Sequence, residues 1–343
     1  MKVLDHPDPR SLFHAVEPRR FGRSICFLCG RRLSPKNRSD EHVIPKWLQS
    51  RFSLWNQNLT LLNGTHIPYR SLTIPCCIVC NTVHLSPIED KVNTATLKGH
   101  KAVAALDPLT LFLWLGKIFY GLLYKEMFLV RDRKSGRRTP IVNRRDLKAF
   151  ALHHLFLQAA RLPFKFDPAI PASIFIFRLA VPADVRLRWD FRDSLPLMTL
   201  SCRVVDVGIL AALQDGGAQR DSKDVFWRRY QKYKLQPLHF TELSAAFFYS
   251  SSLVNRVPKF MIVESPKPSH PVHVVQNPLQ GFSLKPIFDD WKQEAFARLL
   301  SQMIGLPLEQ VFVPPTGVAS WLHDAKGRIH LRRLHGPDSG RFK

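Results

Sequence analysis

The stretch CCIVCN, residues 76–81, holds two cysteines separated by two residues, Cys77 and Cys80. The same spacing occurs upstream, at Cys26 and Cys29. Two such pairs can close a tetrahedral four-thiolate zinc site, which has no open position and is therefore structural. The N-terminal stretch lacks the apolar segment of a secretory signal, and this favours zinc over disulfides at these cysteines.

The segment between the two pairs is long. Residues 30–76 separate them, against roughly 15–20 residues in a compact zinc ribbon. We therefore expect a folded insertion that the metal ties at its base. Cys76 could compete with Cys77 as a ligand, but the spacing to Cys80 favours Cys77. The alternative is two pairs of buried free thiols.

The segment DEHVIPKWL, residues 40–48, lies between the pairs and joins an acid to a histidine, Glu41 and His42. A metal that ties the pairs together would bring both near Asn81, where we expect a helix to begin. Carboxylate and amide oxygens suit Mg²⁺ or Mn²⁺ rather than a second thiolate centre. His42 would lie beside that ion and could take a proton from water. The alternatives are a solvated Glu41-His42 pair and a simple N-cap at Asn81.

Together these motifs resemble the HNH endonuclease superfamily, in the form whose ββα-metal motif is supported by two CxxC knuckles. The resemblance covers residues 22–100. It rests on Cys26, Cys29, Glu41, His42, Pro45, Cys77, Cys80 and Asn81. It implies a phosphodiester hydrolase in which His42 is the general base. Glu41 and Asn81 would hold one catalytic divalent ion, Mg²⁺ or Mn²⁺, while the four cysteines hold structural zinc.

The sequence departs from the family pattern in three places. The usual position of the asparagine that orients the catalytic histidine holds Leu72. Nearby candidates are Asn56, Asn58 and Asn63. The last ligand of the catalytic ion is also open, with His84 and Glu89 as candidates. Finally, Glu41 replaces the commoner Asp or His and lengthens the reach to the ion.

The charge balance favours a polyanionic partner. Lys and Arg number 50 against 27 Asp and Glu, which gives a net charge of +23. DNA is the simplest such partner, with RNA as the alternative. The residues expected to contact it are Arg31, Arg32, Lys46, Arg137, Arg138, Arg228 and Arg229. The segment FWRRYQKYK, 226–234, could stack on bases or form a basic helix that covers a core.

We predict an α+β protein with a small zinc-stabilised, treble-clef-like ββα-metal domain followed by a larger mixed α/β or α+β domain. The predicted parts are an arm at 1–21, the HNH nuclease domain at 22–100, the mixed domain at 101–323 and a basic tail at 324–343. Helices are expected at 46–52, from Asn81 to about 105, at 108–131 and at 144–161, and the stretch 215–232 is expected to contain a loop and a basic aromatic helix. Strands are expected at 173–181 and 197–213, with a helix possible at the end of the second stretch.

The apolar run at 109–130 is long enough to span a bilayer, but three charged residues interrupt it. Lys117, Lys125 and Glu126 would each cost about 2.5–3.5 kcal/mol in a spanning helix. We therefore expect a buried helix in a cytoplasmic protein with no membrane partner.

The leading functional prediction is a metal-dependent DNA endonuclease. One alternative is a zinc-scaffolded nucleic-acid-binding protein without cleavage activity. The other is a nuclease effector of a defence system or mobile element, regulated by a protein partner that docks on residues 101–323.

Overall fold

The computed structural model describes residues 11–14, 22–61, 64–131, 139–222, 226–265, 267, 270–281, 283–314, 317–324 and 326–331. They form two compact units, each assembled from segments that alternate along the chain. Unit 1 contains the chain up to residue 94, with 106–167 and 262–275. Unit 2 contains 95–105, 168–261 and the chain from 276 onward.

A two-stranded antiparallel pair carries the motif residues of unit 1. Strand β1 (Arg38–His42) pairs with β4 (Thr73–Cys77), so that Glu41 lies opposite Ile74 and His42 opposite Thr73. The chain between these strands forms small elements: helix α1 (Lys46–Arg51), strands β2 (Asn58–Thr60) and β3 (His66–Pro68), and the 3₁₀ turn Tyr69–Ser71. The predicted helix at 46–52 and the predicted folded insertion are both confirmed.

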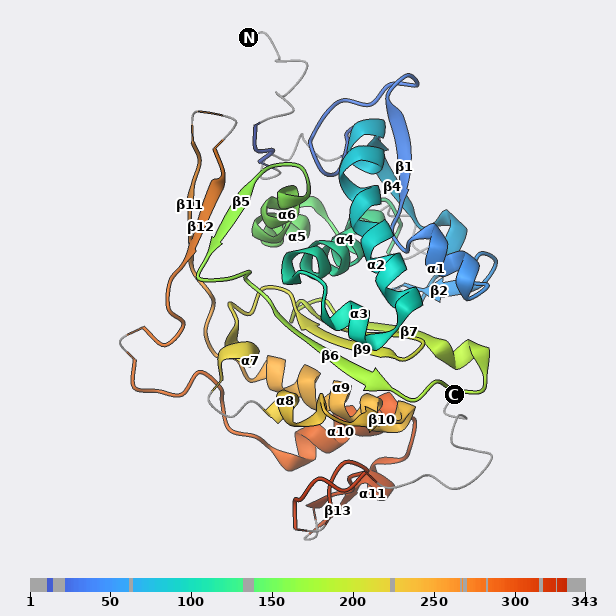
Figure 1. The fold of residues 1–343 in the computed structure, drawn as a ribbon, viewed down its shortest axis with the longest axis vertical. Coiled ribbons are helices and arrows are strands. Elements are labelled where there is room, and N and C mark those ends of the chain that lie inside the picture. The colour runs from blue at the N-terminus through green and yellow to red at the C-terminus, as the bar shows by residue number, and fades with distance from the viewer. Residues whose placement is uncertain are drawn as a thin grey trace. The chain divides into compact units, whose positions relative to one another are not determined.

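A helix follows the second cysteine pair directly. Residues Cys80–Leu85 form a π-helical turn that continues as α2 (Ser86–Lys98), which runs beside the β1–β4 pair in Figure 1. It ends at Gly99, whose φ of +89° suits a glycine. Helix α3 (His100–Ala104) comes next. The predicted helix from Asn81 is confirmed, but Gly99 interrupts it before the predicted end near residue 105.

Helix α4 (Pro108–Glu126) begins where the sequence predicts. The Asp107 carboxylate accepts a hydrogen bond from the Thr110 backbone N–H at 3.1 Å, and proline takes the first helical position. Most of its side chains are buried, which explains why the apolar run is continuous. Among the described residues, no helix is long and apolar enough to cross a membrane.

The predicted helix at 144–161 is interrupted. It forms α5 (Arg144–Ala149), α6 (Ala151–Leu157) and the 3₁₀ turn Gln158–Ala160. A three-stranded sheet of order β11-β12-β5 follows from distant segments, with β12 parallel to β5. Its strands are β5 (Phe164–Asp167), β11 (Phe260–Val263) and β12 (Val272–Gln276).

Unit 2 is built on a five-stranded sheet of order β10-β6-β9-β8-β7, in which only the β10–β6 pair is parallel. The strands are β6 (Ser173–Leu179), β7 (Trp189–Ser194), β8 (Thr199–Val204), β9 (Val207–Ala212) and β10 (Lys234–Leu235), with a 3₁₀ turn at Val185–Arg188. The predicted strand at 173–181 is confirmed, and the run 197–213 forms two strands joined by a tight turn.

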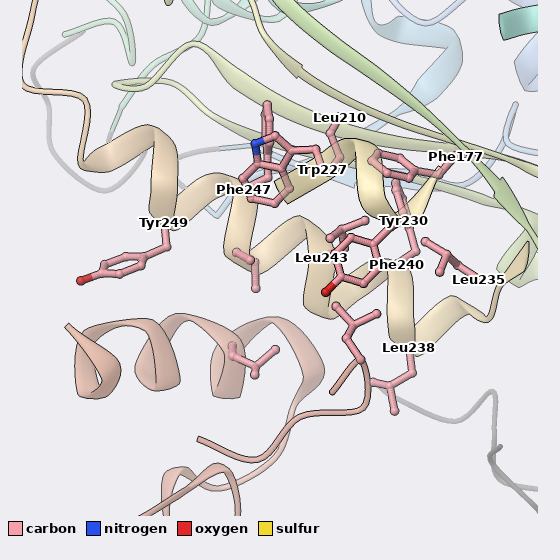
Figure 2. Close-up of a cluster of buried hydrophobic side chains, with 14 of the residues drawn as sticks. Phe177, Leu210, Trp227, Tyr230, Leu235, Leu238, Phe240, Leu243, Phe247 and Tyr249 are labelled. Carbon is pink, nitrogen blue, oxygen red and sulfur yellow. The ribbon is translucent and has the colours of Figure 1, made fainter. Parts of the chain in front are cut away.

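Helices cover one face of this sheet and close the core of unit 2 (Figure 1). They are α7 (Ala218–Asp221), α8 (Phe226–Tyr230), α9 (Pro237–Ser252) and α10 (Gln293–Ile304); α11 (Leu308–Val311) and the pair β13 (Phe312–Val313) and β14 (Gly317–Val318) complete the unit. Figure 2 shows Trp227 and Tyr230 turned into the core beside Phe247 and Phe240. Trp227 and Tyr230 therefore pack inward, whereas Phe226 and Tyr233 are only partly buried against the same core.

The mixed α/β architecture with several small sheets and a four-cysteine cluster confirms the predicted fold class. The compact units do not follow a linear division of the chain. Helix α4, which lies in the predicted second domain, belongs to unit 1.

Candidate metal centre and the residues around it

The four paired cysteines meet in unit 1. The sulfur atoms of Cys26, Cys29, Cys77 and Cys80 all lie within 4.8 Å of one another, the only such group of His, Cys, Asp or Glu found in the described part of the chain. The Cys80 backbone N–H points at the Cys77 sulfur, 3.4 Å away, and so favours its thiolate form. The four cysteines are thus positioned to bind a metal ion, and four thiolates suit structural zinc.

Cys76 stays outside this group although it is fully buried. Successive side chains of a strand point to opposite faces, so Cys76 and Cys77 of β4 cannot both face the same ion. The Cys76 sulfur lies 3.9 Å from that of Cys26 and also interacts with the Cys80 thiol. The preference for Cys77, made from its spacing to Cys80, is confirmed.

The first cysteine pair is fastened to the second by the backbone. The Phe27 N–H donates to the Pro75 carbonyl oxygen at 2.9 Å, which joins the first knuckle to β4. The Phe27 carbonyl oxygen in turn lies 2.7 Å from Nε2 of His154 on α6. Gly30 allows the tight turn after Cys29, since its φ is +71°. The metal centre therefore lies within a framework that also holds the β1–β4 pair.

Glu41 is buried and engaged by a lysine from helix α4. The Lys117 Nζ lies 2.7 Å from Glu41 Oε1 and 2.5 Å from Glu89 Oε1, and it donates to the His42 carbonyl oxygen at 2.9 Å. Burial alone would lower the pKa of Lys117, but the two carboxylates outweigh it and the pKa lies above its ordinary value. Lys117 is therefore a cation at neutral pH. Burial raises the pKa of the Glu89 carboxyl group.

His42 ends strand β1 and is half-buried. Its ring stacks on that of Trp55, with 5.9 Å between centroids and 25° between planes. Burial and, after it, the positive charge of Lys46 lower the pKa of His42, so the imidazole is neutral at pH 7. Within the described residues no hydrogen bond engages its ring nitrogens, and one of them can accept a proton.

Neither Asn56 nor Asn58, two of the residues considered for orienting His42, forms a hydrogen bond with its ring. Asn56 accepts a hydrogen bond from Arg70, and Asn58 lies in β2. Asn63 falls outside the described residues. Trp55, which sequence reasoning missed, is the ring that stacks on the imidazole. No sequence signal marks this role, because Trp55 lies in an irregular segment well away from β1.

The other two predicted ligands of a catalytic ion, Asn81 and His84, lie on the helical turn that follows the second cysteine pair. The Asn81 Nδ2 donates to Ser39 Oγ at 2.8 Å, beside β1. Burial and then Arg161 lower the pKa of His84, which is half-buried on the same helical turn. These contacts leave the assignment of Asn81 and His84 as ligands a prediction.

The oxygen atoms at Glu41 do not fit a divalent ion in this arrangement. Such an ion needs open oxygen ligands at about 2.1 Å for Mg²⁺. Here the ammonium of Lys117 already lies against the Glu41 and Glu89 carboxylates. The contact is made through the Oε1 atom of each carboxylate, so an ion bound at those two atoms would have to displace the Lys117 ammonium.

The basic residues predicted to contact nucleic acid are placed as follows. Arg32, Lys46, Arg228 and Arg229 are exposed, and Arg31 is partly exposed. Arg137 and Arg138 lie outside the described residues. Lys46 begins α1, close enough to His42 to affect its pKa.

Lys117 is the second residue whose role sequence reasoning missed. The sequence shows it as a charge within an apolar run, and a charge that is buried in a protein core needs a partner. That signal predicts an acidic partner without saying which one.

Comparison with protein-family models, with curated proteins and with solved structures finds no match for this chain.

Proposed function

We propose that the chain is an HNH-type endonuclease that hydrolyses phosphodiester bonds in DNA, with zinc in the four-cysteine centre. The observation that carries this proposal is the state of His42. Its imidazole is neutral and half-buried at the end of β1, and its ring nitrogens are free to accept a proton. The net charge of +23 supports a polyanionic substrate.

His42 acts as the general base in this proposal. It takes a proton from the water molecule that attacks phosphorus. As the new bond forms, the bond from phosphorus to the 3′ oxygen breaks, and that oxygen leaves with a proton from solvent. The Trp55 ring stacks on the imidazole meanwhile. The exposed Lys46 attracts the phosphate toward that water. A divalent ion, when bound, would supply Lewis acidity at the phosphate. Because Lys117 occupies the Glu41 oxygen, we assign no step to an ion there.

The test is nicking of supercoiled plasmid, measured in Mg²⁺, in Mn²⁺ and in EDTA. We expect His42→Ala to lower the nicking rate by about 10²–10⁴-fold, which is the usual contribution of a general base. His66→Ala is the matched control, because His66 lies in the same unit at the Thr60 hydroxyl and has no role in the proposal. Equal nicking by wild type and His42→Ala, or none by wild type in any condition, contradicts the proposal.

A second candidate function is nucleic-acid binding without cleavage. The Lys117–Glu41 ion pair favours it, because a nuclease of this type is expected to keep its acidic ligand open for the metal. This candidate predicts binding that weakens steeply with salt concentration and no nicking in any metal. Fluorescence anisotropy with labelled DNA and RNA of the same sequence separates it from the nuclease and shows which nucleic acid is preferred.

A further inference from the structure

We infer that the Lys117 ammonium is a built-in cation that takes the place of a divalent ion at an oxygen cluster formed by Glu41, Glu89 and the His42 carbonyl. All three N–H groups of the ammonium point at these oxygens, at 2.7, 2.5 and 2.9 Å. Each acceptor comes from an element of unit 1 that borders the candidate base: β1 or the helix that follows the metal centre. The inference holds whether the chain cuts nucleic acid or only binds it.

The oxygen cluster has the composition of a cation site. Two carboxylates and a backbone carbonyl are the ligands that Mg²⁺ and Mn²⁺ take in proteins. The Glu41 side chain is 5% exposed and that of Glu89 19% exposed, so neither charge is well solvated. Two buried carboxylates this close to one ammonium repel each other, and a cation between them is required to keep both ionised.

Lys117 supplies the cation between the two carboxylates, and it does so from a fixed position. Its side chain is 3% exposed and extends from a helix that is buried over most of its length. Because the charge is covalently attached, it cannot diffuse away or be removed by a chelator. The ammonium already contacts the Oε1 atom of each carboxylate and the His42 carbonyl oxygen, so a second cation at these three atoms would have to displace it. Metal binding at Glu41 should therefore depend on the absence of Lys117.

The experiment uses the zinc-loaded full chain and Mn²⁺ as the probe. We measure Tm with and without Mn²⁺, and count bound Mn²⁺ by electron paramagnetic resonance, for wild type, Lys117→Ala, Lys117→Ala/Glu41→Gln and Lys125→Ala. Lys125→Ala is the matched control on the same helix. Its ammonium donates to the Ser71 and Thr73 carbonyl oxygens and to no carboxylate in the described chain.

We expect Mn²⁺ to leave the Tm of wild type and of Lys125→Ala unchanged. Lys117→Ala should have a lower Tm in EDTA and regain about 2–4 °C when Mn²⁺ exceeds its Kd tenfold. The added Glu41→Gln substitution should abolish that gain. A folded Lys117→Ala that neither binds Mn²⁺ nor responds to it would overturn the inference.

Wild type alone gives a second decision if Lys117→Ala does not fold. We expect wild type and Glu89→Gln to bind the same amount of Mn²⁺, because no ion should reach Glu89 in wild type. Mn²⁺ binding by wild type that Glu89→Gln abolishes would show that an ion reaches these oxygens beside Lys117, and would overturn the inference. Neither readout uses nucleic acid, so this inference and the proposed nuclease can fail separately.

Discussion

His153 is a buried imidazole whose surroundings exclude charge. It lies on α6 among the rings of Phe112, Phe119 and Tyr120, and its Nε2 is 3.3 Å from the Gly116 carbonyl oxygen. Burial lowers the pKa of His153 from 6.5 to about 4. The folded protein therefore keeps this side chain neutral over a pH range in which the unfolded chain would protonate it.

This difference predicts that the protein loses stability as the pH falls from about 6.5 toward 4. The unfolded state binds a proton that the folded state excludes, and complete protonation would cost roughly 3 kcal/mol for this imidazole. The measurement is the free energy of unfolding between pH 7 and 5.5, in wild type and in His153→Gln. We expect a shallower dependence on pH in His153→Gln, and equal slopes would contradict the assignment. Loss of zinc at low pH affects both proteins alike.

Local sequence patterns predicted the metal centre because the two-residue spacing within each cysteine pair is itself local. Lys117 could not be paired in the same way. Its partners Glu41 and Glu89 are 76 and 28 positions away, and no periodic pattern links residues so far apart. Only tertiary folding brings Lys117 of α4 against Glu41 of β1 and Glu89 of α2.

Helix α4 approaches the motif closely at a glycine. A Cβ atom on Gly121 would lie 2.9 Å from Cγ1 of Val43, the residue after His42. Val43 is fully buried and cannot swing into solvent. Gly121 therefore lets the helix backbone lie against the chain that carries the candidate base.

Gly121→Ala should lower the free energy of unfolding by about 1–3 kcal/mol, because overpacking outweighs the gain in helix propensity of about 1 kcal/mol. Chemical denaturation measures this change. Adding Val43→Ala should relieve the contact, so that Val43→Ala costs less in the Gly121→Ala background than in wild type. Additive effects of the two substitutions would show that the contact is not what limits the packing.

Element boundaries were predictable where a cap or a breaker marks them, as at Asp107-Pro108 and Gly99. The turn between β8 and β9 carries no such mark. Val205 takes a φ of +57° there, which a β-branched residue rarely adopts. The sequence therefore predicts a single strand region over 197–213, although the residues form a two-stranded hairpin.

At the scale of the whole molecule, each compact unit draws on segments far apart in the sequence. The predicted domain boundary lies near residue 100, because the sequence motifs end there. Residues 106–167, with α4, belong with the motif region instead. The four-cysteine centre lies in that unit, where it fastens the first knuckle to β4 and the helix that follows.

The central claim is that this four-cysteine centre holds the zinc that sets β1, β4 and His42 in place. The most direct test is the metal content of wild type, Cys76→Ala and Cys77→Ala, measured by mass spectrometry after purification. We predict about one zinc ion per chain in wild type and Cys76→Ala, and loss of zinc with unfolding of the module in Cys77→Ala. A folded wild type without zinc, or a Cys77→Ala variant that keeps its zinc while Cys76→Ala loses it, would contradict the claim.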